Sequence, residues 1–167
     1  MDLPVGEFLE SGIIVKGNIV KEKVAALLET DFAGYVVITI EGRSGIEEGA
    51  LLLQQNRAIG AIFDYLRFSK KVLGEEAVAH FFNAAKADFG VMDIISLTKQ
   101  QIELIIAFNE KIELGKPLLQ RDLAKIGTEK FNPGLAESAL GNELLKRESR
   151  FDVFRKVGLT EFTRKID

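Results

Sequence analysis

Apolar residues recur at helical spacing in three segments of the first 114 residues. After the helix-capping residue Asn18, positions 20, 24, 27 and 28 are apolar, which places them on one face of a helix that ends at Gly34. The same spacing predicts a helix beginning at Gly74, with an apolar face at positions 78, 81, 82 and 85. Thr98 and Gln101 have the spacing of a capping box and open a third helix, predicted to run to about Leu114.

Between the first two helices, three short apolar runs predict strands. These runs cover residues 35–40, 49–54 and 58–65, and the polar joint at residues 55–57 is typical of a hairpin turn. Residues 34–66 therefore form a three-stranded antiparallel meander, and residues 89–95 form a further strand. The predicted fold class is α+β, with a mainly antiparallel sheet, packed helices and a helical C-terminal extension.

The predicted sheet is apolar on both faces. Val36, Ile38 and Ile40 line one face, yet Tyr35, Val37 and Thr39 on the other face are hardly polar. Half-buried sheets alternate polar and apolar residues, so the second face is expected to be covered by a helix, by the tail or by another subunit. The helix at 98–114 is also apolar over a wide arc, because Leu104 and Phe108 extend its buried stripe. Together these surfaces predict a homodimer.

Residues 116–167 differ from residues 1–115, so we predict an α+β domain over 1–115 and a helical extension over 116–167. Helices are expected at 118–126 and 135–147. From Glu143 onward the chain holds seven basic and five acidic residues, mixed with phenylalanines. Phe151, Phe154 and Phe162 are candidate partner-binding residues, with packing against the main domain or a partner as the preferred interpretation and RNA or an acidic membrane surface as alternatives.

Composition excludes much of the usual chemistry. The 167 residues include no Cys, no Trp and one His, which removes disulfides, thiolate metal sites and cysteine nucleophiles. The net charge of −3 does not favour a nucleic-acid partner. The sequence has no membrane-length apolar run and no secretory signal pattern, and the expected compartment is the cytoplasm. No catalytic residue, metal site or cofactor is predicted.

The few candidate chemical groups have plainer interpretations. His80 follows Glu76 by one helical turn, but we place it opposite the apolar stripe, as a solvated pair. Asp64, Asp88 and Asp93 are expected at strand ends and turns, where aspartate hydrogen-bonds the backbone. Residues 120–143 resemble a helix-turn-helix only weakly, because the second helix carries acids instead of bases.

Two arginines lie at predicted turns of the meander. Arg43 belongs to the Gly-Arg-Ser-Gly segment at 42–45, which joins two strands and lacks the pattern of a phosphate-binding loop. Arg57 belongs to the next turn. Both arginines are candidate residues for binding an anion or an acidic partner.

The order strand, helix, three-stranded meander, helix, strand, helix across residues 13–114 resembles the N-terminal domain of PatA-type response regulators. The resemblance is carried by Gly34-Tyr35-Val36-Val37-Ile38, by Gly49-Ala50-Leu51-Leu52-Leu53, by Ile59-Gly60-Ala61-Ile62 and by Gly74-Glu75-Glu76-Ala77. The whole chain is still more similar to a family of uncharacterised archaeal proteins that carry this domain. The resemblance implies an archaeal protein with a signalling or scaffolding role, and it supplies no active-site residues.

The expected function is a non-enzymatic protein-interaction or scaffolding module in cytoplasmic signalling. Two alternatives stay open at this point. One is a small-ligand sensor with its pocket between the meander and the 98–114 helix, and the other is nucleic-acid binding through the basic and aromatic C-terminal tail.

Overall fold

The structure, a computed structural model, describes residues 3–42, 45–127 and 129–141. The chain divides into two compact units, Met1–Pro133 and Gly134–Asp167. The first unit holds the sheet and four α-helices, and the described part of the second is the helix α5 (Gly134–Leu140). The strand β7 (Glu113–Leu118) spans the position where residues 1–115 were expected to end, and it pairs with a strand of the main sheet.

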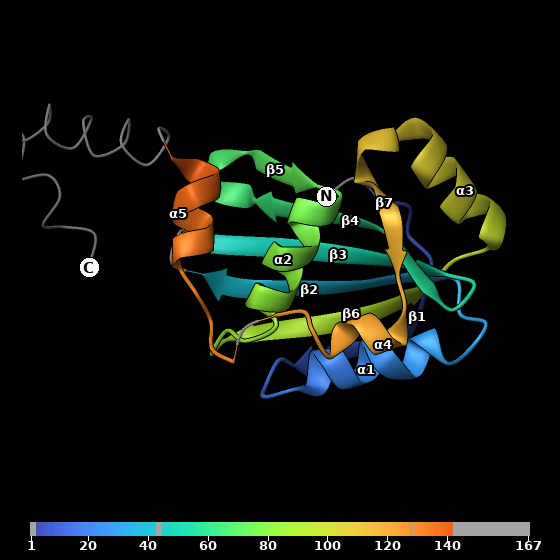
Figure 1. The fold of residues 1–167 in the computed structure, drawn as a ribbon, viewed down its shortest axis with the longest axis horizontal. Coiled ribbons are helices and arrows are strands. Elements are labelled where there is room, and N and C mark those ends of the chain that lie inside the picture. Colours follow the sequence, from blue (N-terminus) through green and yellow to red (C-terminus); the bar gives the residue numbers. More distant parts are fainter. Residues whose placement is uncertain (1–2, 43–44, 128, 142–167) are drawn as a thin grey trace, which may run out of the picture. The chain divides into compact units, whose positions relative to one another are not determined.

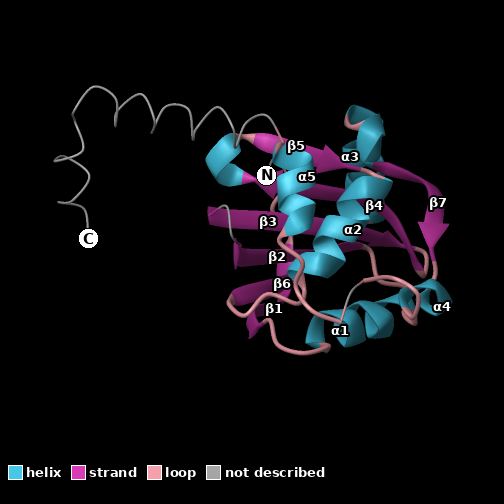
Figure 2. Ribbon diagram, turned by 60° about the vertical axis from the view of Figure 1, so that its left-hand side comes forward, coloured by secondary structure: helices cyan, strands magenta, loops and turns pink. Residues whose placement is uncertain are grey.

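A seven-stranded sheet forms the centre of the first unit (Figures 1 and 2). Its order is β1-β6-β2-β3-β4-β5, and β7 pairs with β4 beside that path. The other six strands are β1 (Glu7–Ile14), β2 (Gly34–Gly42), β3 (Gly45–Gln54), β4 (Arg57–Tyr65), β5 (Lys70–Leu73) and β6 (Gly90–Ser96). Every pairing described is antiparallel, which confirms the predicted α+β class with its antiparallel sheet.

The predicted meander is strands β2, β3 and β4. The turn between β3 and β4 consists of Gln55 and Asn56, which both have positive φ, at 52° and 61°. Two consecutive residues of positive φ give the turn a twist that matches the flanking strands, and asparagine tolerates this conformation well. The turn chemistry in the sequence therefore located this hairpin correctly, while β3 begins at Gly45, earlier than the apolar run indicates.

Helices cover the two faces of the sheet unequally. The helices are α1 (Ile19–Leu28), α2 (Glu75–Ala84), α3 (Lys99–Phe108) and α4 (Gln120–Leu123). In Figure 1, α2 lies in front of the central strands. At its end, Lys86 Nζ donates to Gly17 O and Asn18 Oδ1 at the start of α1, so α1 lies on the same side. We call this side the covered face.

The covered face is packed closely where α2 crosses β3. A Cβ built on Gly49 would meet the Phe63 ring at 2.8 Å and the Phe81 ring at 3.2 Å. Glycine at this position therefore lets the helix and its aromatic side chains approach the sheet backbone. Phe63 and Phe81 are almost fully buried, as the apolar periodicity of both segments predicts.

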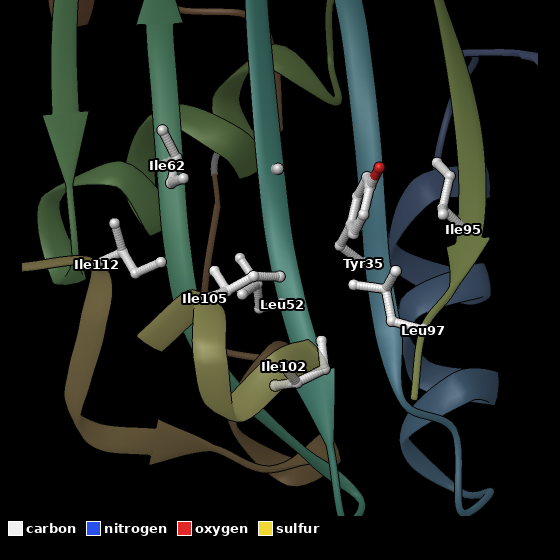
Figure 3. Packing of buried hydrophobic residues seen from close by; sticks show 9 residues of the cluster. Tyr35, Leu52, Ile62, Ile95, Leu97, Ile102, Ile105 and Ile112 are labelled. Atoms are coloured by element: carbon white, nitrogen blue, oxygen red, sulfur yellow. The ribbon is translucent and has the colours of Figure 1, made fainter. Parts of the chain in front are cut away.

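The helix α3 packs on the opposite face, which we call the second face. Figure 3 shows Ile102 and Ile105 of this helix against Leu52, with Tyr35 and Ile95 on the neighbouring strands. A Cβ on Gly60 would lie 3.2 Å from both the Ile106 side chain and the Ile112 carbonyl oxygen. Glycine thus permits close approach on this face too, and the prediction that a helix contributes to covering it is confirmed.

Four elements, α3, β7, β5 and β1, differ from the sequence-based expectation. The α-helix begun at Thr98 ends at Phe108, where Asn109 Nδ2 donates to Ile105 O, and a short 3₁₀ segment at Glu110–Ile112 follows. β7 comes next, and Pro117 is tolerated because the strand lies beside the main path of the sheet. β5 and the N-terminal half of β1 were missed because lysines and glutamates interrupt their apolar patterns.

Candidate functional site

The second face is only half covered, and its uncovered half carries apolar side chains. The antiparallel register places Phe8 opposite Ile95 and Ile14 opposite Val91, while Ile95 contributes to the core beneath α3. Residues opposite one another in an antiparallel pair share a face, so these side chains lie on the side of α3. Ile46 on β3 has the parity of Leu52 and joins them. We call these side chains the open strip: Phe8 (56% exposed), Ile14 (70%), Ile46 (48%) and Val91 (41%).

Acidic residues accompany the open strip. Glu41 and Glu48 have the same strand parity as Ile46 and Thr39. Asp93 lies in β6 between the rows of Ile95 and Val91, and its Oδ1 accepts hydrogen bonds from Ser11 Oγ at 2.8 Å and Gly12 N at 2.7 Å. The open strip therefore combines apolar side chains with negative charge. Through its two hydrogen bonds, Asp93 also holds the irregular middle of β1 against β6.

Both edges of the sheet carry features that oppose strand-to-strand association. β1 has register shifts between Phe8 and Glu10 and between Glu10 and Ile13, and Gly12 adopts a φ of 69°. The other edge strand, β5, has four residues and begins with two lysines. Irregular, short and charged edges are the usual means by which proteins avoid edge-to-edge pairing. A partner of this sheet therefore meets a face more readily than an edge.

A hollow lies at the end of α3, on the same side of the sheet. It has a volume of about 490 Å³, and its apolar lining comes from Ile62 of β4, Leu73 of β5 and Ile112. Lys71 and Lys111 contribute ammonium groups, and Phe108 at the rim is 82% exposed. A hollow of this size, with an apolar lining and a few charged groups, has the features of a small-molecule site. We call it the lysine hollow.

A second hollow lies on the other flank of α3 and contains the candidate residue Arg57. Its volume is about 420 Å³, and Glu103 and Glu113 line it together with apolar residues. Arg57 is exposed, and its guanidinium donates to Gln55 Oε1 at 3.0 Å. The other arginine candidate, Arg43, lies outside the described residues, as do Phe151, Phe154 and Phe162.

The placement of His80 on the solvent side of its helix was wrong. His80 is 3% exposed, and its Nδ1 forms a 2.7 Å hydrogen bond with the Tyr65 hydroxyl of β4 on the covered face. The helix buries more of its circumference than the apolar stripe indicates, since Ala77 and Ala84 are buried beside that stripe. A histidine can occupy this position because a strand residue supplies its polar partner.

Burial changes the titration of this pair. Desolvation lowers the pKa of His80, and the nearby carboxylate of Glu76 opposes that change to a smaller extent. Desolvation raises the pKa of the Tyr65 hydroxyl, and the charges of Glu47 and Glu76 raise it further. At neutral pH both groups are therefore neutral, which is the state that suits a buried hydrogen bond.

The aspartates expected at turns take different positions. Asp93 bonds a backbone amide, as expected, although it lies within β6. Asp64 lies within β4 with its side chain 6% exposed, and its Oδ2 is 4.0 Å from Lys71 Nζ. Asp88 is exposed before β6.

Among the described residues, no three His, Asp or Glu side chains group as metal ligands. No helix in those same ranges has the length and apolar composition of a membrane-crossing segment.

The fold and these surfaces define a small α+β protein with one covered and one half-open sheet face. Residues 1–109 match the family model described as "Uncharacterized protein conserved in archaea (DUF2226)", and the chain belongs to this family. No curated protein and no solved structure matches the chain. The family match confirms the archaeal part of the resemblance seen in the sequence, while the PatA-type part stays a prediction.

Proposed function

We propose that the protein is a non-enzymatic interaction module that forms a homodimer through the open strip. The observation that carries the proposal is the set of four exposed apolar side chains on the half of the second face that α3 leaves uncovered. Exposed apolar groups that share one face of a sheet are typical of protein-interaction surfaces. Because the edges of the sheet are irregular or short, we infer that association uses this face.

A twofold arrangement centred on Ile14 and Val91 keeps Glu41 and Glu48 away from the centre, and the nearby Asp93 already accepts hydrogen bonds from Ser11 and Gly12 of its own chain. In such an arrangement the same residues of both copies meet, so the apolar pair would lie at the centre of the interface. Counted from β6, Glu41 lies one strand and Glu48 two strands further across the sheet, toward the rim. Polar groups at an interface rim stay hydrated, so their mutual repulsion is weakened by solvent and salt.

The decisive experiment compares the mass of the full chain in solution with that of two matched variants. Val91→Lys introduces a charge in the open strip, whereas Ala26→Lys introduces the same charge on an exposed position of α1, on the covered-face side. We expect the unaltered chain and Ala26→Lys to sediment as dimers, and Val91→Lys to sediment as a monomer. In the proposed twofold arrangement the introduced lysines of the two copies would meet at the apolar centre of the interface, and burying these like charges together opposes association.

The control for folding is thermal unfolding of all three proteins. Val91 is partly exposed at the surface of the monomer, so its replacement is expected to change the stability of an isolated chain by no more than about 0.5 kcal/mol. A monomer at every concentration of the unaltered chain would contradict the dimer. Dimers of equal strength in both variants would show that the interface lies elsewhere.

The cellular setting of this module is part of the proposal. We propose that it acts in cytoplasmic signalling, and the support is the resemblance of residues 13–114 to the N-terminal domain of PatA-type response regulators. A scaffolding role agrees with this setting because the proposed interface leaves the flanks of α3 accessible. Pull-down from an archaeal extract, with Val91→Lys as the comparison, tests whether other proteins bind the same strip.

A second candidate function is a small-ligand sensor, and the lysine hollow is the observation that favours it. The hollow lies where β4 and β5 meet the end of α3, whereas the sequence predicts a sensor pocket between the meander and this helix. Its volume and its apolar lining suit a ligand of low molecular mass. Mass spectrometry of purified protein under native conditions tests this candidate by detecting a retained small molecule.

A further inference from the structure

The lysine hollow combines an apolar floor with positive charge at two of its walls. Ile62 and Leu73 are register partners on β4 and β5, and Ile112 is 1% exposed, so these three side chains belong to the folded core. Lys71 precedes Leu73 by two residues and shares its side of β5. Lys111 comes from the 3₁₀ segment after α3, so the two ammonium groups reach the hollow from different elements.

The charges of the two hollows beside α3 differ in sign. Two lysines and one glutamate, Glu110, line the lysine hollow, an excess of one positive charge among its lining residues, and the carboxylate of Asp64 lies 4.0 Å from Lys71 Nζ. One arginine and two glutamates line the hollow of Arg57, which leaves an excess of one negative charge. The two hollows have similar volumes, and Ala107 of α3 lines both of them. We therefore expect the ligands of the two hollows to differ in charge and not in size.

Phe108 adds an aromatic surface to the lysine hollow. It is the last residue of α3 and is 82% exposed, although a phenylalanine gains about 1.5–3 kcal/mol when its side chain is fully buried. A ligand with an apolar body would cover this ring and the floor at once. An anionic group on that ligand would then lie near the two ammonium groups.

The geometry points to the lysine hollow as a binding site for a small amphipathic carboxylate. The apolar body of the ligand contacts Ile62, Leu73 and the Phe108 ring, and its carboxylate lies between Lys71 and Lys111. This inference rests on the proposed sensor function and names the ligand class of that site. It does not depend on the homodimer, because the open strip uses other residues.

The experiment uses phenylbutyrate, phenylbutanol and phenylbutylamine as three probes that share one apolar body and differ in charge. Binding to the isotope-labelled full chain is followed by NMR shifts. Phenylbutyrate is expected to bind about three- to tenfold more tightly than the alcohol, in line with a charge-assisted hydrogen bond at a partly exposed site. The amine is expected to bind most weakly, and added salt is expected to weaken only the carboxylate.

Matched variants locate the site. Lys71→Gln is compared with Lys70→Gln, because Lys70 is its neighbour on β5 and points to the other face. We expect Lys71→Gln to weaken phenylbutyrate about three- to tenfold and Lys70→Gln to leave it unchanged. Since Lys71 is near the buried Asp64, Lys111→Gln serves as a second test on an exposed residue and should weaken binding similarly.

A steric variant gives an independent readout. Ala107 is exposed and lines the hollow, so Ala107→Trp fills it and should abolish binding of both phenylbutyrate and phenylbutanol. Leu104→Trp, one turn earlier on an exposed position of the same helix, should not abolish binding.

Equal binding of the three probes, or equal effects of Lys70→Gln and Lys71→Gln, would overturn the carboxylate assignment while leaving a ligand site. Binding of none of the probes would overturn the carboxylate inference, whereas the sensor function is tested separately by the search for a retained small molecule.

Discussion

The two faces of the sheet are covered by helices of the same length and yet differ in what they leave exposed. On the covered face, α2 buries Phe81 over Gly49 and even encloses a histidine that bonds a strand tyrosine. On the second face, α3 buries Ile102 and Ile105 and leaves Phe108 exposed. The difference arises from position, because α2 crosses the central strands, whereas α3 covers one end of them. One face therefore buries nearly all of its apolar side chains, whereas the other leaves several of them exposed.

The largest expected effect comes from a matched pair of phenylalanines on these two helices. Phe81→Ala removes a fully buried ring and should lower the free energy of unfolding by about 3–5 kcal/mol. Phe108→Ala removes an exposed ring and should change it by no more than about 0.5 kcal/mol. Urea denaturation monitored by circular dichroism measures both. Similar losses in the two variants would show that the second face is covered as thoroughly as the first.

A matched pair of tyrosines gives the next largest effect. Tyr65→Phe removes the partner of His80 Nδ1 inside the covered face, and a buried polar group left without its hydrogen bond costs about 1–3 kcal/mol. Tyr35 on the second face donates to Pro4 O at 3.1 Å, and this hydrogen bond is only part-buried. Tyr35→Phe should therefore cost about 0.5–1.5 kcal/mol. A larger loss for Tyr35→Phe than for Tyr65→Phe would reverse the comparison.

Hydrophobic periodicity in the sequence predicted most of the buried residues on the covered face and fewer of the residues on the second face. The strands of the meander, the turn at Gln55 and Asn56 and the capping box at Thr98 all follow from local chemistry that the sequence displays directly. The open strip was not predicted residue by residue, because it depends on which strand pairs with β6. A strand order of β1-β6-β2 brings Ile14 beside Val91 across 77 residues of sequence, and no local pattern encodes that contact.

The misplacement of His80 has a related cause. A helical wheel ranks the sides of α2 by their apolar content, and it places position 80 away from the stripe at 78, 81, 82 and 85. It contains no information about Tyr65, which lies 15 residues earlier and supplies the hydrogen bond. The sequence predicts a sensor pocket between the meander and the long helix, whereas the residues of the lysine hollow depend on β5 and on the early end of α3, which the sequence did not indicate.

The buried histidine makes the stability of the covered face depend on pH. Because the pKa of His80 is lowered in the folded state, the unfolded chain takes up the proton first as the pH falls below about 6.5. The stabilising contribution of the neutral ring is therefore present above that pH and is lost as the pH falls toward the lower pKa of the folded state. Thermal unfolding at a series of pH values should show this loss in the unaltered chain.

The variant His80→Gln is the control for this dependence, since glutamine keeps a hydrogen-bonding group near Tyr65 and does not titrate. Its stability should vary less with pH between about 7 and 5 than that of the unaltered chain. Glu76, whose charge raises the pKa of His80, stays in both proteins. An identical pH dependence of the two proteins would assign the effect to the carboxylates elsewhere in the chain.

The smallest of these effects concerns how firmly α3 is held on the second face. The Thr98 hydroxyl accepts a hydrogen bond from Gln101 N, and the Gln101 side chain accepts one from Thr98 N, so the capping box is complete. Thr98→Ala should lower stability by about 1 kcal/mol. Because α3 covers only one end of its face, we expect faster amide exchange to be concentrated in residues 99–108, while α2 keeps its protection. Equal acceleration in both helices would show that the two faces unfold as one cooperative unit.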